Sequence, residues 1–274
     1  MTTLLAQPLT LPCGLILPNR LVKAAMTEGL ADGDNRATAR LTRLYQIWGQ
    51  GGAGLQLTGN VLVDRRYLEA PGNVVIEEGI GDEAKAALRE WAEAARSGGG
   101  KVIMQVSHAG RQTPGTICER PVAPSDVPLE MPGRALMPFG HPRALTSEEV
   151  DDVIKRFVFV CRTAEETGFD GVQIHAAHGY LLSQFLSPKA NRRTDKWGGS
   201  LENRSRLLME IIRQTRQMVS PSFAIGVKLN AADFQQGGFT HDDCLDVVDW
   251  LNTEKVDFIE ITGGNYEQPQ MMGM

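Results

Sequence analysis

The sequence predicts an α/β fold of the (β/α)8 TIM-barrel type, with about six of the eight β/α units in a single domain over residues 1–274. Six short apolar runs alternate with amphipathic helical patterns, and this alternation favours right-handed crossovers and a parallel sheet. Long irregular segments follow three of the runs, at residues 62–81, 107–145 and 175–199. Elaborate loops after the strands are typical of a barrel. No Gly-x-Gly-x-x-Gly pattern follows the first run, which argues against a dinucleotide-binding open sheet.

The predicted strands are the six apolar runs. Most of them lack polar alternation, as expected of strands buried on both faces of a parallel sheet. They are Leu21–Met26, Leu55–Val61, Val102–Val106, Gly171–Ile174, Ala224–Leu229 and Phe258–Thr262.

The helices between the strands are predicted from a periodic apolar face and from their caps. Thr146 and Glu149 form a capping-box pattern, and Gly168 stands where that helix should end. Thr240, with Asp243 three residues on, predicts another N-terminal cap. Besides the helix after Thr146, we expect helices at Thr38–Gln50, Asp82–Ser97, Ser200–Val219 and Thr240–Glu254. The Pro-rich stretch Pro121–Pro142 is long for a loop, and we expect a lid or a small hairpin there.

The composition narrows the possible partners and the compartment. The formal net charge is -5 and the charges are mixed along the chain, so no basic block points to nucleic acid. The four cysteines are far apart, as expected of reduced thiols. The N-terminus does not resemble a signal peptide, and no apolar run reaches the ~18 residues of a membrane span. We therefore expect a cytoplasmic protein without membrane or nucleic-acid partners.

Three polar residues follow the fourth predicted strand. His175 and His178 are three positions apart and would point the same way on a helical turn. Two neutral imidazoles can donate two hydrogen bonds to one carbonyl oxygen that is becoming an enolate, and Tyr180 could give a proton to the adjacent carbon. Two alternatives remain open. Each histidine could be structural, or His-x-x-His could be half of a metal site, although no third ligand is evident and no metal is expected.

Two other polar side chains interrupt apolar strands. If Lys228 is buried, it needs an anionic or polar partner, which could be a ligand or an Asp or Glu on a neighbouring strand. A lyase that uses Lys228 as a Schiff base is a further alternative. Gln105 needs partners for both ends of its amide, which a heterocycle with edge carbonyls and N–H groups could supply.

Four segments carry a family resemblance that extends from about Leu9 to the end of the chain. The most specific is 175–204, which reads HAAHGYLLSQFLSP at 175–188 and NRRTDKWGGSLENR at 191–204. The others are QVSHAGR at 105–111, Asn19-Arg20 followed by Ala25-Met26-Thr27, and KLNAADF at 228–234. Together they resemble the old yellow enzyme family of NAD(P)H:flavin oxidoreductases.

The resemblance implies an FMN-containing barrel that uses NADH or NADPH to reduce enones or similar activated alkenes. Hydride would pass from the nicotinamide to flavin N5, and then to the β-carbon of the substrate. His175 and His178 would hold the substrate carbonyl, and Tyr180 would donate the proton. By position, the residues at the flavin would be Ala25, Met26, Thr27, Gly59, Gln105, His175 and Lys228, with Thr27 near the C4 carbonyl and Lys228 near the N1–O2 edge.

The sequence departs from the family pattern in three ways. Ala25 stands where Pro is common, and Lys228 where Arg is common, which keeps the charge but loses the planar fork. The family's last two strands, which carry its FMN-phosphate groups, have no counterpart in this sequence. The alternative function is therefore a truncated, non-catalytic relative that cannot retain FMN on its own.

Overall fold

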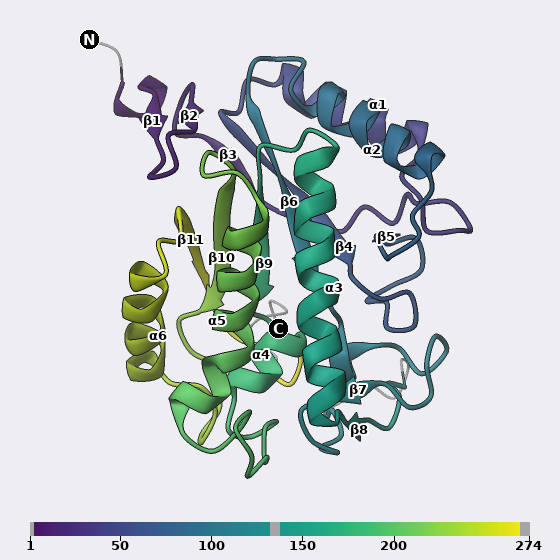
Figure 1. Cartoon of the computed structure of the whole chain (residues 1–274), viewed down its shortest axis with the longest axis vertical. Helices are drawn as coiled ribbons and strands as arrows, with labels where there is room; N and C mark the ends of the chain where they lie inside the picture. The colour runs from purple at the N-terminus through teal and green to yellow at the C-terminus, as the bar shows by residue number, and fades with distance from the viewer. Residues whose placement is uncertain (1–2, 132–137, 269–274) are drawn as a thin grey trace.

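The strands of the main sheet are parallel and follow one another across the sheet in chain order. The computed structural model describes residues 3–131 and 138–268 (Figure 1). The order is β3-β4-β6-β9-β10-β11, and β5 adds to the end of β4. The strands of this sheet are β3 (Val22–Lys23), β4 (Leu55–Leu62), β5 (Val74–Val75), β6 (Lys101–Ser107), β9 (Gly171–Ala176), β10 (Ala224–Asn230) and β11 (Phe258–Thr262). This order confirms the predicted barrel-type fold as an open half-barrel of six successive strands.

The first predicted strand is wrong in its extent. The prediction was Leu21–Met26, but only Val22–Lys23 pairs, with β4. Among the described residues β3 is an outer strand of the sheet, and Leu21, Val22 and Met26 are each at least half exposed. Their apolar character therefore does not reflect burial on both faces. The other five predicted strands are observed, and their ends differ by no more than two residues.

Helices cover one face of the sheet, and their predicted caps are observed. The Thr146–Glu149 capping box starts α3, and Gly168, with φ +88°, follows its end. A second capping box joins Thr240 and Asp243 at the start of α6. The helices are α1 (Ala39–Gln50), α2 (Asp82–Ala95), α3 (Ser147–Glu166), α4 (Leu181–Leu186), α5 (Leu201–Met218) and α6 (His241–Thr253). Within the described residues, no helix combines the length and the apolar character needed to cross a membrane.

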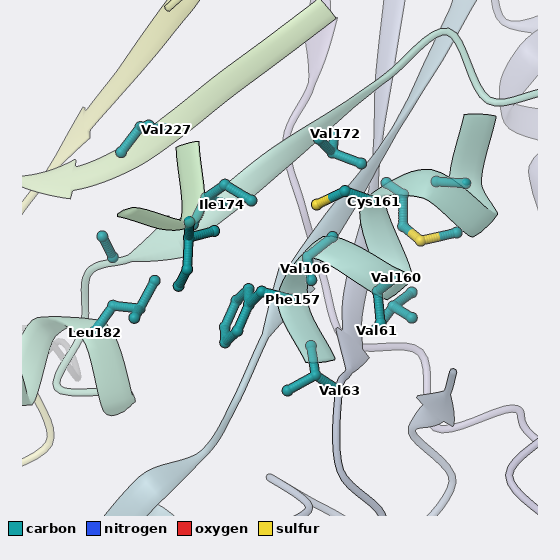
Figure 2. Close-up of a cluster of buried hydrophobic side chains, with 14 of the residues drawn as sticks. Val61, Val63, Val106, Phe157, Val160, Cys161, Val172, Ile174, Leu182 and Val227 are labelled. Atoms are coloured by element: carbon teal, nitrogen blue, oxygen red, sulfur yellow. The ribbon is translucent and has the colours of Figure 1, made fainter. Parts of the chain in front are cut away.

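The main hydrophobic core lies between the outer face of the sheet and these helices. Figure 2 shows alternate residues of neighbouring strands, such as Val106, Ile174 and Val227, around Phe157 of α3. All four of these side chains are completely buried. Because alternate residues of a strand face opposite sides, this packing fixes which residues point to the inside of the half-barrel.

The inner face changes from apolar to polar along the strands. At its amino-terminal end, Leu57, Ile103 and Ala224 form a small core with Leu11 and Leu17. The last two belong to an N-terminal hairpin of β1 (Leu9–Thr10) and β2 (Ile16–Leu17), which lies at the opposite end of the sheet from α4 (Figure 1). The hairpin thus closes the apolar end, and the polar residues are left at the carboxyl ends.

The described parts of the Pro-rich stretch 121–142 do not pair with each other as the expected hairpin would. Val122–Ala123 (β7) pairs in parallel with Arg143–Ala144 (β8), so the two ends of the stretch run side by side in the same direction. Residues 132–137 lie outside the described part of the chain, and with them the middle of the expected lid. The short 3-10 helices Leu4–Ala6 (η1) and Gly110–Gln112 (η2) complete the described elements.

The contact between Gly226 and Phe258 gives a test of the inner packing. These residues are in register on β10 and β11, and a β-carbon at Gly226 would overlap the Phe258 ring. We expect Gly226→Ala to lower the free energy of unfolding by about 1–3 kcal/mol, because the ring must shift. Denaturant unfolding measures the change. Gly33→Ala, where a β-carbon meets nothing within 4 Å, is the matched control and should stay within about 0.5 kcal/mol of wild type. Equal stabilities of the two variants would contradict this packing.

Candidate active site

His175 and His178 lie at the carboxyl end of β9, but they are not on a helical turn. His175 is in the strand, and His178 follows it in the left-handed backbone region, with φ +60°. The peptide N–H of His178 donates to Asn230 Oδ1 at 3.1 Å, and its ring Nε2 lies 2.9 Å from Thr262 Oγ1. The ring centroids of the two histidines are 5.2 Å apart. The expected pair of neighbouring imidazoles is therefore present, although His178 has a left-handed and not a helical backbone.

Burial keeps both imidazoles neutral. It is the largest cause that lowers the pKa of His175 well below its usual value, followed by the charges of His178 and Lys228. Burial, and then the charge of Lys228, lowers the pKa of His178 to about 4. His175 Nδ1 is buried without a hydrogen-bond partner in the described structure. Neutral imidazoles can each offer one N–H to a substrate oxygen.

Tyr180 stands edge-on to His175, at the start of α4. The ring centroids are 4.8 Å apart at 78°, and the Tyr180 hydroxyl lies 3.0 Å from the hydroxyl of Tyr266. Burial raises the pKa of Tyr180 well above its usual value, and the negative charge of Glu69 adds to this. The phenol therefore keeps its proton at neutral pH. This is the state that a proton donor needs.

Lys228 has an ionic partner on the next strand. Its Nζ lies 2.9 Å from Glu260 Oε1, and the two residues are in register on β10 and β11. This is the ion pair that the sequence left open as an alternative to a ligand. Glu260 also accepts a hydrogen bond from Gln173 at 2.9 Å, and Gln173 accepts one from Gln105 at 2.6 Å. Each of these side chains occupies a polar position in an apolar strand, so the reasoning applied to Gln105 could have found Gln173 and Glu260 as well.

The predicted residues that follow β3, together with Gly59 of β4, form the other side of the site. Ala25 is half-buried, and Met26 and Thr27 are exposed. Gly59 is buried, and a β-carbon there would overlap the backbone of Met26 and Thr27. Glycine at 59 therefore allows the segment after β3 to lie against β4. The Thr27 hydroxyl donates to the carboxylate of Glu69, at 3.0 and 3.1 Å from its two oxygens. Sequence reasoning missed Glu69, because it lies in a long loop with no periodic pattern.

The residues present fit the ring of a flavin. Buried polar atoms without a partner in the described structure stand at the ends of two strands, namely Asn60 Oδ1 and His175 Nδ1. Thr27 and Lys228 add a hydroxyl and a cation. Hydroxyl, amide, imidazole and ammonium groups complement a heterocycle whose edge alternates carbonyls and N–H groups. Within 3–131 and 138–268, no three His, Cys, Asp or Glu side chains gather as a metal site would require.

The fold and this site define a half-barrel with a polar mouth at the carboxyl ends of its strands. The sequence profile of the NADH:flavin oxidoreductase / NADH oxidase family matches residues 5–269. The chain belongs to this family, and the predicted resemblance to the old yellow enzymes is confirmed.

Two fungal relatives are similar over almost the whole chain. An NADH-dependent flavin oxidoreductase of Hypocrea jecorina is 39% identical over 277 residues, which are 96% of this chain and 69% of the relative. An NADH-dependent flavin oxidoreductase of Neonectria sp. is 38% identical over 278 residues, 97% of this chain but 36% of the relative. The chain thus spans only part of the length of these relatives.

Two solved structures resemble the chain closely. A 2-naphthoyl-CoA reductase in complex with 2-naphthoyl-CoA gives a TM-score of 0.90 at 26% identity, over 98% of this chain and 42% of that one. An old yellow enzyme homologue from Zymomonas mobilis gives 0.82 at 25% identity, over 99% of this chain and 79% of that one.

The lowered pKa of His178 makes stability depend on pH. An unfolded histidine titrates near 6.5 and folded His178 at about 4, so between these values the unfolded chain binds more protons. Lowering the pH from about 7.5 to about 5.5 should therefore cost about 1 kcal/mol of unfolding free energy through this residue. His178→Gln should lose correspondingly less over the same range. Denaturant unfolding at both pH values measures the difference.

His241→Gln, at an exposed histidine, is the matched control. The same loss in His178→Gln and wild type would show that the pKa of half-buried His178 is not lowered as described.

Proposed function

We propose that this protein is an FMN-dependent NAD(P)H oxidoreductase that reduces the activated C=C bond of α,β-unsaturated carbonyl compounds. The observation that carries the proposal is the group at the end of β9, where two neutral imidazoles stand beside a buried phenol. Membership of the NADH:flavin oxidoreductase / NADH oxidase family supports it. The alternative lyase chemistry needs a free amine, and the ion pair of Lys228 with Glu260 speaks against it.

When bound, FMN supplies hydride transfer between a nicotinamide and the alkene. Seven residues would hold it: three that follow β3, one in each of β4, β6 and β10, and His175 in β9. Thr27 and Gln105 would offer hydrogen bonds to its ring edge, and Lys228 would favour negative charge at the pyrimidine end. Because Glu260 pairs with Lys228, part of that effect would be offset. The set is Ala25, Met26, Thr27, Gly59, Gln105, His175 and Lys228.

His175 and His178 would bind the substrate carbonyl oxygen. If the Thr262 hydroxyl donates to Nε2 of His178, the ring proton of this neutral histidine is on Nδ1 and can be donated. Hydrogen bonds fixed before the reaction stabilise the negative charge that develops on the oxygen. A charged imidazole would instead bind anions in the ground state, so the lowered pKa of both residues suits this role.

Tyr180 would protonate the α-carbon of the substrate. Its ring packs edge-on against His175, one of the two histidines that would hold the carbonyl, and its raised pKa keeps the proton available at neutral pH. Burial also excludes water, which would compete as a proton donor.

The function is tested by the flavin absorbance of the purified protein. We expect NADH or NADPH, added without oxygen, to remove the absorbance, and a cyclic enone to restore it. If neither nicotinamide removes the absorbance of bound flavin, the proposal is wrong.

One observation favours the alternative of a relative that cannot retain FMN. The outer strands β3 and β11 carry exposed apolar side chains, among them Val22 and Ile261, and unpaired strand edges promote association. Expression of residues 1–274, followed by gel filtration, distinguishes an FMN-binding enzyme from a relative that cannot retain FMN. An aggregating, colourless product supports the alternative, and a yellow monomer with one FMN per chain excludes it.

The proposed roles predict that Tyr180→Phe separates the two half-reactions. Alkene reduction should slow by roughly 10²-fold or more, since general acids typically contribute 10²–10⁴. Reduction of the flavin by nicotinamide needs no proton from Tyr180 and should change little. Stopped-flow absorbance measures each half-reaction alone. Equal losses in both would assign Tyr180 a structural role.

A further inference from the structure

Tyr266 brings a second phenol to the candidate proton donor. Its hydroxyl lies 3.0 Å from the hydroxyl of Tyr180, and the two rings meet edge-on, with centroids 6.0 Å apart at 66°. Either hydroxyl can donate in this hydrogen bond, because a phenol is both a donor and an acceptor. The two oxygens are therefore in direct contact, and a proton can pass between them.

Contacts on both sides of Tyr266 fix its position at the mouth. The residue lies in the loop after β11, where its neighbour Asn265 forms a parallel bridge with His178. Its other neighbour, Glu267, accepts a hydrogen bond from the buried side chain of Arg111 at 2.8 Å. Because both adjacent residues are anchored, the loop holds the second phenol against the proton donor.

The two phenols differ in their access to water. Tyr180 is only 4% exposed, whereas Tyr266 is half-buried and reaches solvent. Burial is the largest cause that raises the pKa of Tyr180 well above its usual value. A negative charge is better solvated on the more exposed residue, so it is more stable on Tyr266 than on Tyr180. Once Tyr180 has given up its proton, transfer of a proton to it from Tyr266 is therefore favourable.

We propose that Tyr266 relays a proton from solvent to Tyr180 after each turnover. The inference rests on the proposed function, in which Tyr180 protonates the substrate. In that step the O–H bond of Tyr180 breaks, a C–H bond forms at the substrate α-carbon, and the electron pair stays on the Tyr180 oxygen.

The relay returns both phenols to their starting state in two proton transfers. Because a phenol ordinarily titrates at about pH 10, Tyr266 has a proton to give at neutral pH. Its O–H bond breaks, an O–H bond forms on Tyr180, and the negative charge moves to the Tyr266 oxygen. An acid in the solvent, such as hydronium, then protonates Tyr266. In this role Tyr266 acts on Tyr180 and not on the substrate.

Single-turnover and steady-state rates of the FMN-loaded protein test the relay. In Tyr266→Phe, one oxidation of reduced flavin by a cyclic enone should proceed near the wild-type rate, because Tyr180 starts with its proton. Repeated turnover should slow, and kcat should fall roughly 10-fold or more, since a positioned proton-transfer group typically contributes 10²–10⁴. Stopped-flow absorbance measures the first rate, and nicotinamide consumption measures the second.

Tyr67→Phe is the matched control, since it removes the hydroxyl of another buried tyrosine, whose ring stacks on His108. It should leave both rates unchanged. Equal losses of the two rates in Tyr266→Phe would show that Tyr266 only orients Tyr180. A wild-type kcat would show that Tyr266 takes no part in the reaction. Either result overturns the proposal.

A titration without flavin or substrate separates the relay from the proposed function. Carbon-13 NMR of labelled tyrosine rings follows both phenols, with Tyr180→Phe and Tyr266→Phe to assign their signals. As the pH rises, Tyr266 should lose its proton before Tyr180, because the charge is better solvated there. If Tyr180 loses its proton first, the relay is refuted even in a protein that reduces enones. The expected order in a protein that reduces no enone would refute the proposed function, and the relay with it.

Discussion

The register of β9, β10 and β11 is the constraint on which the site depends. Parallel pairing places His175 opposite Lys228 and Lys228 opposite Glu260. The residues between them, such as Ile174 and Val227, face the helices and form the main core. A slip of one residue would turn the polar row into that core and the apolar row into the mouth. The hydrophobic packing on one face therefore fixes the positions of the polar groups on the other.

Burial controls the electrostatics of the mouth more than any single charge pair does. It is the largest cause of the lowered pKa at both histidines and of the raised pKa at Tyr180. Lys228 is itself buried, and its ammonium group is tolerated because Glu260 supplies the opposite charge across the strand pair. At β9 and β10 the mouth thus presents uncharged hydrogen-bond donors next to a neutralised cation. Such groups bind a neutral carbonyl compound better than an anion.

The sequence predicted those parts of the fold and site that local patterns determine. The capping boxes at Thr146 and Thr240 were recognisable because their partners are three residues away. That His175, His178 and Tyr180 lie close together was predictable because they are near one another in the chain. The partner of Lys228 depends on which residue of the next strand lies opposite, and the chain alone does not specify that register. The first strand was predicted too long because the sequence does not distinguish exposed apolar residues of an outer strand from buried ones.

Contacts across long loops were the least predictable features. The parallel pairing of β7 with β8 joins segments about twenty residues apart, and nothing in either segment indicates its direction. Glu69 is another feature that the sequence does not predict. Its neighbours along the chain show no periodicity, and its partners Thr27 and Asn60 come from two different strands. The β7–β8 pairing and the contacts of Glu69 both depend on which loops the folded sheet places next to one another.

The left-handed backbone at His178 limits which side chains can occupy this position. Residues with a β-carbon rarely adopt this conformation, and asparagine, aspartate and glycine tolerate it best. Glycine would remove the polar group, and aspartate would replace the imidazole N–H donor with a negative charge. Asparagine alone combines a tolerated backbone with an N–H donor, although its shorter side chain would hold the oxygen closer to the strand end. Natural or engineered diversity at this position should therefore be confined to histidine and asparagine, whereas His175, in an ordinary strand conformation, is limited by its side-chain chemistry alone.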